Sequence, residues 1–214
     1  MTSRNFTPDQ TSEWDILAHT YQLDTHKLSQ FKIYLELLQT WNKNINLTAI
    51  QETLAIIQYH FYDSLSASRY ISLNEIASVA DIGAGAGFPG LPLKIMYPHI
   101  KLFLIEVNQK KVKFLQTVID QLALSDVHIY FQDWRTFLRT TSYPIDLFVA
   151  RASLQISDMF RIFRSSSPYN NALLAYWASS HWKPENAEQN SYVVHQWSYQ
   201  VDSRVRKLVL FKRP

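Results

Sequence analysis

The first third of the chain carries a pattern of apolar residues that predicts helices. Between Asp24 and Lys43, apolar side chains recur at spacings of three and four, which places them on one face of a helix: Leu28, Phe31, Leu35, Leu38 and Trp41. Asp24 or Thr25 is suited to cap its start, because a short polar side chain can accept hydrogen bonds from the free amides of the first turn. The ranges 9–21 and 52–63 are also helical in pattern, so we expect an all-helical N-terminal region.

Short apolar segments alternate with helical patterns in the rest of the chain. Helical patterns occupy 91–96, 109–122 and 156–164, and seven segments have the character of strands: 76–82, 101–107, 127–131, 145–150, 172–177, 192–197 and 207–212. This alternation is typical of a mainly parallel sheet covered on both faces, with an antiparallel hairpin formed by the last two strands. We therefore expect an α/β fold in which a helical extension, residues 1–70, packs as one unit with a main domain, residues 71–214. The polar segment 181–191 should form a loop.

Composition narrows the class of protein. The 214 residues are 47% apolar and contain no cysteine, which excludes disulfides, thiolate zinc sites and cysteine nucleophiles. No apolar run approaches the roughly 18 residues of a membrane span, and the first ten residues lack the pattern of a secretory signal. We expect a cytoplasmic protein with no membrane contact, and a monomer, since no apolar heptad pattern is evident.

Glycine is unusually rare and unusually concentrated. Average usage predicts about fifteen glycines in a chain of this length. Only four occur, all within eight residues: Gly83, Gly85, Gly87 and Gly90. They follow a predicted strand and precede a predicted helix, which is where an open α/β sheet binds ligands. Asp81 stands just before them, and Glu106 ends the next strand, where a carboxylate can accept hydrogen bonds from ribose hydroxyls. These features predict a pocket for an adenosine-bearing ligand.

The identity of that ligand has two main alternatives. Residues 85–90 match the Gly-x-Gly-x-x-Gly fingerprint of dinucleotide sites, which would make the protein an NAD(P)-dependent oxidoreductase. Three features favour S-adenosylmethionine. An acid, Asp81, stands two residues before the first glycine; the segment lies behind a helical region rather than at the N-terminus; and Pro89 removes one N–H group from a turn that would hold a pyrophosphate. A glycine turn without any ligand is the least favoured alternative.

Several motifs resemble one family, the bacterial 16S ribosomal RNA guanine-N7 methyltransferases, also called glucose-inhibited division protein B. The similar segments are Trp41 to Thr48, His60 to Leu65, Asp81 to Pro92, Lys111 to Leu115, and Ala150 to Ser153 with Asp158 after it. The resemblance extends from about Leu35 to Phe211. It implies a Rossmann-like methyltransferase fold, S-adenosylmethionine as methyl donor, and N7 of a guanine in 16S ribosomal RNA, or in the small ribosomal subunit, as acceptor.

The resemblance also implies roles for individual residues. Gly83 and Phe88 would line the cofactor together with Asp81, Gly85, Gly87 and Glu106. Trp134 and Arg135 would occupy the site that contacts the adenine, with Asp133 just before them. Arg151 would lie beside the methionine end and the target base, and Arg206 matches an arginine on the family's last strand.

Three departures from the family pattern stand out. Trp134-Arg135 replaces an alanine-glutamate pair, and Val107 to Lys111 replaces a serine-leucine-glycine-lysine-arginine segment. Where the family's strand ends in leucine-lysine-glycine, this chain reads Leu174 to Ser179 and has no basic residue. A catalytically impaired, RNA-binding or ribosome-binding relative is therefore a further alternative.

The chemistry of N7 methylation limits what the site must supply. Guanine N7 already has a lone pair, so no general base is needed and positioning dominates. We expect Arg151 to be the catalytic residue, holding O6 of the base or a phosphate; the alternative is a salt bridge to Asp146 or Asp158.

Basic and polar side chains complete the expected site. RNA phosphates should contact two basic groups, one at 110–113 and one at 204–213 that begins with Arg204. The residues selected from them are Lys110, Lys111, Lys113, Arg206 and Lys207. His60 and Asp63, at helical spacing, should link the helical region to the main domain by hydrogen bonds rather than bind a metal.

Overall fold

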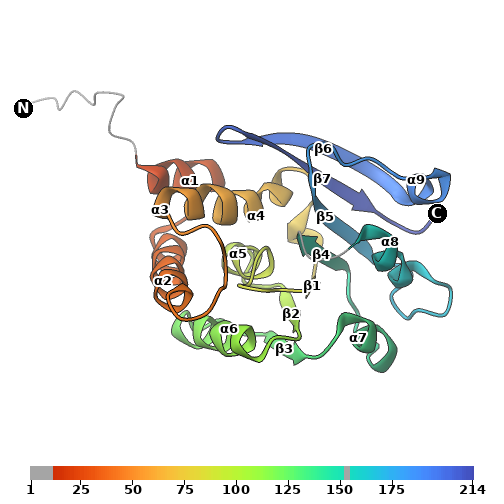
Figure 1. The fold of residues 1–214 in the computed structure, drawn as a ribbon, viewed down its shortest axis with the longest axis horizontal. Helices are drawn as coiled ribbons and strands as arrows, with labels where there is room; N and C mark the ends of the chain where they lie inside the picture. The colour runs from red at the N-terminus through yellow and green to blue at the C-terminus, as the bar shows by residue number, and fades with distance from the viewer. Residues whose placement is uncertain (1–11, 152–154) are drawn as a thin grey trace, which may run out of the picture.

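A computed structural model describes residues 12–151 and 155–214, and in these residues seven strands form one sheet in the order β3-β2-β1-β4-β5-β7-β6 (Figure 1). The strands are β1 (Ser78–Ile82), β2 (Lys101–Glu106), β3 (Val127–Phe131), β4 (Leu147–Arg151), β5 (Leu173–Ser179), β6 (Val193–Val201) and β7 (Arg204–Phe211). Neighbouring strands from β1 to β5 pair in parallel, whereas β7 runs antiparallel to β5 and β6. The predicted mainly parallel sheet with a C-terminal hairpin is confirmed.

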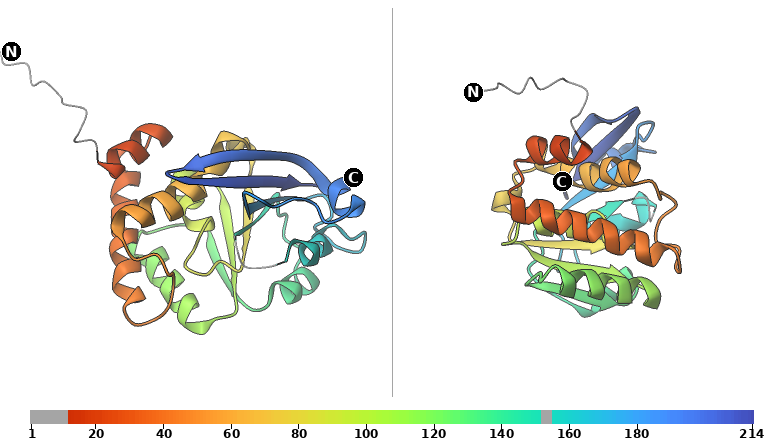
Figure 2. Two further views of the ribbon diagram at one scale, coloured as in Figure 1. Left: turned by 45° about the horizontal axis from the view of Figure 1, so that its top comes forward. Right: turned by 90° about the vertical axis from the view of Figure 1, so that its left-hand side faces the viewer.

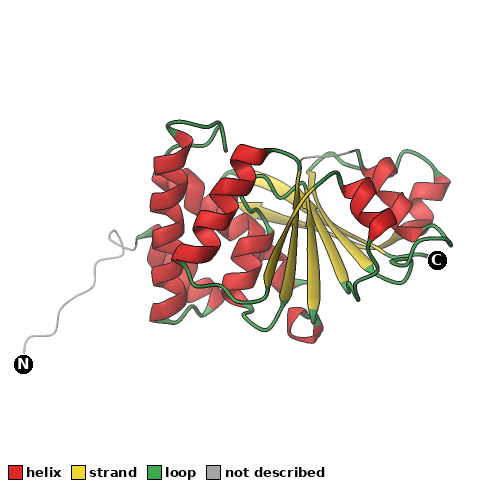
Figure 3. Cartoon of the chain, turned by 90° about the horizontal axis from the view of Figure 1, so that it is seen from below, coloured by secondary structure: helices red, strands yellow, loops and turns green. Residues whose placement is uncertain are grey.

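The sheet separates two hydrophobic cores. Successive side chains of a strand point to opposite faces, so Val79 joins one core, while Ala80 and Ile82 join the other. The first core includes side chains of α1 (Glu13–Tyr21), α2 (Thr25–Asn42), α5 (Gly90–Met96) and α6 (Gln109–Gln121). The second includes those of α7 (Trp134–Thr140) and α8 (Ile156–Met159). Figure 3 shows the helices on either side of the strands, and in Figure 2 the orange helix α2 lies outermost on its side.

The helical N-terminal region forms largely as predicted. The Asp24 side chain accepts a hydrogen bond from the amide of Lys27 (2.8 Å) and caps α2. The predicted helix at 52–63 is divided into α3 (Thr53–Ile56), a π-helical segment η2 (Ile57–Tyr62) and α4 (Asp63–Leu65). Such π-helical turns occur frequently at functional sites. Residues 9–11 of the first predicted helix lie outside the described residues.

Short elements account for the differences from prediction. Residues 181–191 are not entirely a loop, because α9 (Ala187–Tyr192) forms there and Asn186 caps it through the amide of Gln189 (2.8 Å). The helix predicted at 156–164 divides into α8 and the 3-10 helix η5 (Phe160–Phe163), and α7 was not predicted. The helices α8 and α9, of four and six residues, cover fewer than two helical turns and show no clear helical period. The remaining 3-10 turns are η3 (Ser66–Arg69) and η4 (Leu73–Glu75).

No helix in the described part of the chain is both long enough and apolar enough to cross a membrane.

Phe61 joins the helical region to the glycine loop, and its removal should destabilise the protein. Its fully buried ring lies 5.1 Å from the ring of Phe31, 5.4 Å from that of Tyr34 and 5.9 Å from that of Phe88, between centroids. We expect Phe61→Ala to lower the free energy of unfolding by about 3–5 kcal/mol, measured by urea denaturation. The control Phe131→Ala, at a side chain that is 58% exposed, should change it by less than about 0.5 kcal/mol. Equal effects would contradict this account.

Candidate active site

The glycine loop lies at the carboxyl edge of the parallel strands and is fastened to β2. The amides of Gly83 and Ala84 donate to the carbonyl of Ile105 at 2.9 and 3.1 Å. The amide of Gly85 donates to Oε2 of Glu106 at 2.8 Å. The loop is therefore held open at the point where the strand order reverses direction, between β1 and β4, which is the usual ligand position in such sheets.

The glycines serve different purposes. Gly85 has φ +59°, and a Cβ placed on it would meet only the carbonyl oxygen of Gly83, at 3.7 Å, so this part of the loop faces open space. A Cβ on Gly90 would lie 2.7 Å from Oδ2 of Asp81, so only glycine permits that approach. Gly87 is covered by Tyr34 and Leu91 and lines neither of the two cavities described next.

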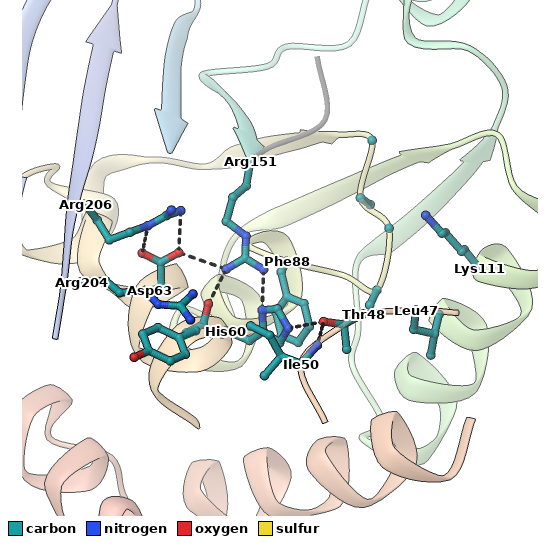
Figure 4. Close-up of a pocket in the computed structure, with 15 residues that line it drawn as sticks. Leu47, Thr48, Ile50, His60, Asp63, Phe88, Lys111, Arg151, Arg204 and Arg206 are labelled. Carbon is teal, nitrogen blue, oxygen red and sulfur yellow. Dashed lines mark hydrogen bonds and ion pairs between the residues drawn. The ribbon is translucent and has the colours of Figure 1, made fainter. Parts of the chain in front are cut away.

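Two adjoining cavities open beside the loop. The larger, which we call the arginine cavity, has a volume of about 410 Å³ (Figure 4). Its polar and aromatic lining consists of Thr48, Tyr59, His60, Asp63, Phe88, Lys111, Arg151, Arg204 and Arg206, with Gly83 and Gly85 from the loop. The smaller, which we call the tryptophan cavity, has about 230 Å³ and is lined by Gly83, Ile105, Glu106, Val107, Lys111, Gln132, Asp133 and Trp134. Gly83 and Lys111 line both, so the two cavities are neighbours.

Asp63 is the centre of a buried ionic network. Its side chain is 3% exposed, and Oδ2 lies 3.2 Å from Nη1 of Arg151 and 3.4 Å from Nη2 of Arg206. Oδ1 accepts a hydrogen bond from the hydroxyl of Tyr199 at 2.6 Å, and the backbone carbonyl accepts one from the Trp177 indole at 2.9 Å. One carboxylate faces two guanidinium groups, so the arginine cavity keeps a net positive charge.

Arg151 is held by several contacts at once. Besides its bond to Asp63, it donates to the carbonyl of Tyr59 (3.1 Å) and to Nδ1 of His60 (3.0 Å), and its guanidinium lies 5.1 Å from the centre of the Phe88 ring. A pairing with Asp146 or Asp158, the alternative considered from the sequence, is wrong. Asp146 accepts the amides of residues 77 and 78, and Asp158 pairs with Arg135 at 2.9 Å.

His60 is a neutral hydrogen-bonding link. A guanidinium N–H can only donate, so Nδ1 must accept from Arg151, which leaves Nε2–H to donate to Oγ1 of Thr48 at 2.8 Å. The ring stacks on Phe88 with centroids 4.5 Å apart. Burial, and then the positive charge of Arg151, lowers the pKa of His60 to about 3. The expected hydrogen-bonded link between the helical region and the main domain is confirmed for both His60 and Asp63.

Two carboxylates hold the base of the loop. Asp81 is fully buried and its Oδ2 accepts from the amide of Gly90 at 2.8 Å, whereas Oδ1 has no partner among the described residues. Burial raises the pKa of the Asp81 carboxyl to about 7. Glu106 also accepts the amides of Val107 and Asn108, at 2.9 and 2.8 Å, through Oε1.

The predicted adenine-side residues lie at the start of α7. Asp133 caps the helix by accepting the amide of Arg135 at 2.8 Å. The guanidinium of Arg135 lies 5.0 Å from the centre of the Trp134 ring, and Trp134 is buried with no partner for Nε1 in the described structure. Of these three residues, Asp133 and Trp134 line the tryptophan cavity, and Arg135 points to Asp158.

The predicted basic residues are distributed unevenly. Lys111 and Arg206 line the arginine cavity, while Lys110 and Lys113 lie in the first turn and a half of α6, and Lys207 donates to the carbonyl of Trp182 at 2.6 Å. Arg204, which stacks 4.1 Å from the centre of the Tyr59 ring, is a lining residue that sequence reasoning placed only in a general basic group. Ala152 and Ser153 lie outside the described residues.

Tyr199 and Trp177 were missed as partners of Asp63, because their contacts span 136 and 114 positions of sequence. No local pattern signals pairings at such a separation.

The fold and this loop define the class of Rossmann-like S-adenosylmethionine-dependent methyltransferases. Solved structures share the arrangement of the chain. One is a mutant of MtNAS in complex with S-adenosylmethionine (TM-score 0.55, 14% identity, 96% of this chain and 86% of that one). Another is TrmK of M. capricolum in complex with S-adenosyl-homocysteine (TM-score 0.56, 13% identity, 71% and 68%). At these identities the likeness is one of fold.

Sequence comparison supplies the family. Residues 27–209 match the GidB family, described as rRNA small subunit methyltransferase G, and the chain belongs to this family, as the resemblance predicted. The ribosomal RNA small subunit methyltransferase G of Geobacillus sp. (strain WCH70) is 38% identical over 160 residues, 74% of this chain and 67% of that protein. The protein of the same name from Listeria monocytogenes serotype 4b (strain CLIP80459) is 39% identical over 138 residues, 64% of this chain and 58% of that protein. The match thus spans about three fifths to two thirds of the relatives' lengths.

Replacing His60 should alter the pH dependence of stability. The folded protein keeps His60 neutral down to about pH 3, while the unfolded chain protonates it near pH 6.5. The unfolded state therefore binds more protons between these values, and the contribution of His60 is lost as the pH falls through that window. The difference in unfolding free energy between wild type and His60→Gln should shrink from about pH 7 to about pH 5, measured by urea denaturation. The exposed control, His26→Gln on α2, should give a difference near zero at each pH. A His60→Gln difference independent of pH would refute the buried neutral histidine.

Proposed function

We propose that this protein transfers a methyl group from S-adenosylmethionine to N7 of a guanine in 16S ribosomal RNA. The observation that carries the proposal is the pair of adjoining cavities at the glycine loop of a GidB-family chain, one suited to adenosine and one lined by arginines. We further propose that it acts as a monomer in the cytoplasm on RNA or on the small ribosomal subunit. Residues 1–70 would serve as a helical extension of a main domain formed by residues 71–214.

The tryptophan cavity fits the adenosine part of the donor. Its wall contains the aromatic side chain of Trp134 and the carboxylates of Glu106 and Asp133. Adenine offers an aromatic face and an amino group, and ribose offers hydroxyl donors that a carboxylate can accept. The adenosine part would therefore be held by Trp134, Glu106 and Asp133. Arg135 would stabilise the Trp134 ring, and Asp81 would hold the glycine loop through the amide of Gly90.

The arginine cavity fits the anionic end of the donor and the nucleotide that receives the methyl group. Gly83, Gly85 and Phe88 form the side nearest the loop, and Gly87 shapes the loop beneath Tyr34. S-adenosylmethionine supplies an electrophilic methyl group on a sulfonium. Arg151 would orient O6 of the base or a phosphate, because its guanidinium is fixed by Asp63, His60 and the carbonyl of Tyr59.

The proposed reaction needs no general base, and the site offers none in His60. The lone pair of guanine N7 attacks the methyl carbon without losing a proton, so the site must supply fixed charges in the right places and not a proton acceptor. His60, with its pKa near 3 and both ring nitrogens bonded, is suited to hold Arg151 and not to accept a proton from substrate.

The departure at the end of β5 is compensated on the neighbouring strand. Ser179, the last residue of β5, pairs directly with Arg206 of β7, and Arg206 and Arg204 both line the arginine cavity. Positive charge is therefore present at this edge although β5 has none. This observation favours an active enzyme over a catalytically impaired relative, and Lys110, Lys111, Lys113 and Lys207 would add phosphate contacts around it.

Cofactor choice and activity are tested together. Calorimetric titration should show binding of S-adenosylhomocysteine and none of NADH. A tritiated-methyl assay should show transfer to small subunits that lack the modification. Binding of NADH alone would overturn the proposal in favour of an oxidoreductase, and binding of S-adenosylhomocysteine without transfer to RNA or subunits would leave only a cofactor-binding protein.

Substitution of Arg151 should impair transfer more than folding. The change Arg151→Lys keeps the positive charge, but a lysine cannot bridge Asp63, His60 and the Tyr59 carbonyl together. We expect kcat/KM to fall by about 100-fold or more in the tritium assay. Arg69→Lys, at an exposed arginine outside both cavities, should keep wild-type kinetics. Unchanged kinetics in Arg151→Lys would show that Arg151 contributes charge alone.

A further inference from the structure

A third cavity, lined by arginines, lies between α7 and η5, on the face of the sheet opposite α6. Its volume is about 540 Å³, and we call it the α7 groove. Four arginines line it: Arg135, Arg139, Arg161 and Arg164. Five hydroxyl side chains complete the polar lining: Thr140, Thr141, Ser142, Ser166 and Ser167. None of these residues belongs to the two cavities at the glycine loop.

The positive charge of the α7 groove is only partly neutralised. Asp158 lies 2.9 Å from Arg135 and 3.8 Å from Arg161, and Asp133 lies 3.8 Å from Arg135. Within residues 12–151 and 155–214, no carboxylate lies within 4.0 Å of the basic nitrogens of Arg139 or Arg164, both of which are exposed. Four guanidinium groups against two carboxylates leave two positive charges facing solvent.

The chemistry of this lining suits phosphate groups. Guanidinium forks match the geometry of phosphate oxygens, and hydroxyl groups donate further hydrogen bonds to them. The lining as described includes Leu138 and Pro168 but no aromatic ring on which a base could stack. A ligand held here would be bound through its backbone and not through its bases.

Successive residues of α7 line the tryptophan cavity and the α7 groove. Trp134 lines that cavity and Arg135, the next residue, lines the groove, with its guanidinium over the Trp134 ring. Lys111 lines both cavities at the glycine loop. It belongs to α6, which packs on the face of the sheet opposite α7. Figure 1 shows α6 and α7 on either side of β2 and β3. Positive charge thus lies on both faces of the sheet.

We propose that the α7 groove binds the phosphate backbone of the RNA substrate, at a stretch of the RNA outside the arginine cavity that receives the target nucleotide. The assignment rests on the proposed function, because it takes the RNA to be the substrate of the neighbouring cavities. Two backbone phosphates contact Arg139 and Arg164, which have no acidic partner among the described residues, while Arg135 and Arg161 remain tied to Asp158 and shape the groove.

The test compares two double variants that remove the same charge. Arg139→Gln/Arg164→Gln alters the groove, and Lys32→Gln/Lys43→Gln removes two exposed cations from the α2 region, away from the groove. Binding of an unmethylated 16S ribosomal RNA transcript is measured between about 50 and about 200 mM KCl. Losing two phosphate contacts should lower the magnitude of the slope of log K against log salt by about 1.4, at about 0.7 per contact on a single strand. The control should keep the wild-type slope.

A charge-restoring variant separates loss of contacts from misfolding. Arg139→Lys/Arg164→Lys should recover the wild-type slope, since the slope counts neutralised phosphates, and thermal unfolding of all variants should match wild type. A groove variant with the slope of the control would overturn the proposal. A second outcome would also overturn it. If inorganic phosphate stabilises wild type but not the groove variant, and the two have the same RNA slope, the groove is a site for a free small anion.

Failure of the proposed function gives a different result. The affinity for S-adenosylhomocysteine and the rate of transfer at saturating RNA should be equal in wild type and in the groove variant. If wild type binds the transcript with the steeper slope but transfers no methyl group to the transcript or to small subunits, the enzymatic function is overturned and the groove is supported. If transfer occurs and the slopes agree, the groove alone is overturned.

Discussion

The buried carboxylate of Asp63 is the constraint on which the site depends. It contacts Arg151 at the end of β4, Arg206 on β7 and Tyr199 on β6, and the Trp177 indole of β5 donates to its backbone carbonyl. Removing one partner of such a buried pair leaves an uncompensated charge, which typically costs about 3–5 kcal/mol. Asp63 therefore binds the helical region to the strands β4, β5, β6 and β7. The arginine cavity lies at these contacts, so they determine its shape and its charge.

A second consequence concerns charge at the carboxyl edge of the sheet. His60 stays neutral because it is buried and faces Arg151, so the positive charge of the cavity comes from Lys111 and from the guanidinium groups of its three arginines. Arg204 and Arg206 on the antiparallel hairpin supply cations beside a β5 that has none at its end. A relative can thus lose a basic residue from one strand and keep a positive charge at this edge, provided that the neighbouring strand has a basic residue at the paired position.

The two faces of the sheet contribute differently to recognition. On the α6 face, Lys111 stands beside cavities already shaped for a cofactor and a base. On the α7 face, the arginines stand beside hydroxyl groups and no rings in the described lining, which suits a phosphate backbone. An RNA chain is long compared with a single nucleotide, so contacts on both faces would fix its register without reading its sequence.

The sequence alone determined the elements and the chemistry that depend on local pattern. The apolar period of three and four between Leu28 and Trp41 predicted α2, and the alternation of strands and helices predicted a mainly parallel sheet. The glycines and Asp81 predicted where a ligand belongs, because backbone freedom and close approach are properties of a few adjacent residues. Tertiary structure alone decided the partners of Asp63 and Arg151, the covering of Gly87 by Tyr34, and the grouping of Arg139 with Arg164. Most of these contacts join segments tens to more than a hundred residues apart in the chain. Local periodicity records which side of an element is apolar. It does not record which distant side chain will contact the polar groups of that element, because this depends on the order in which the strands pair in the sheet.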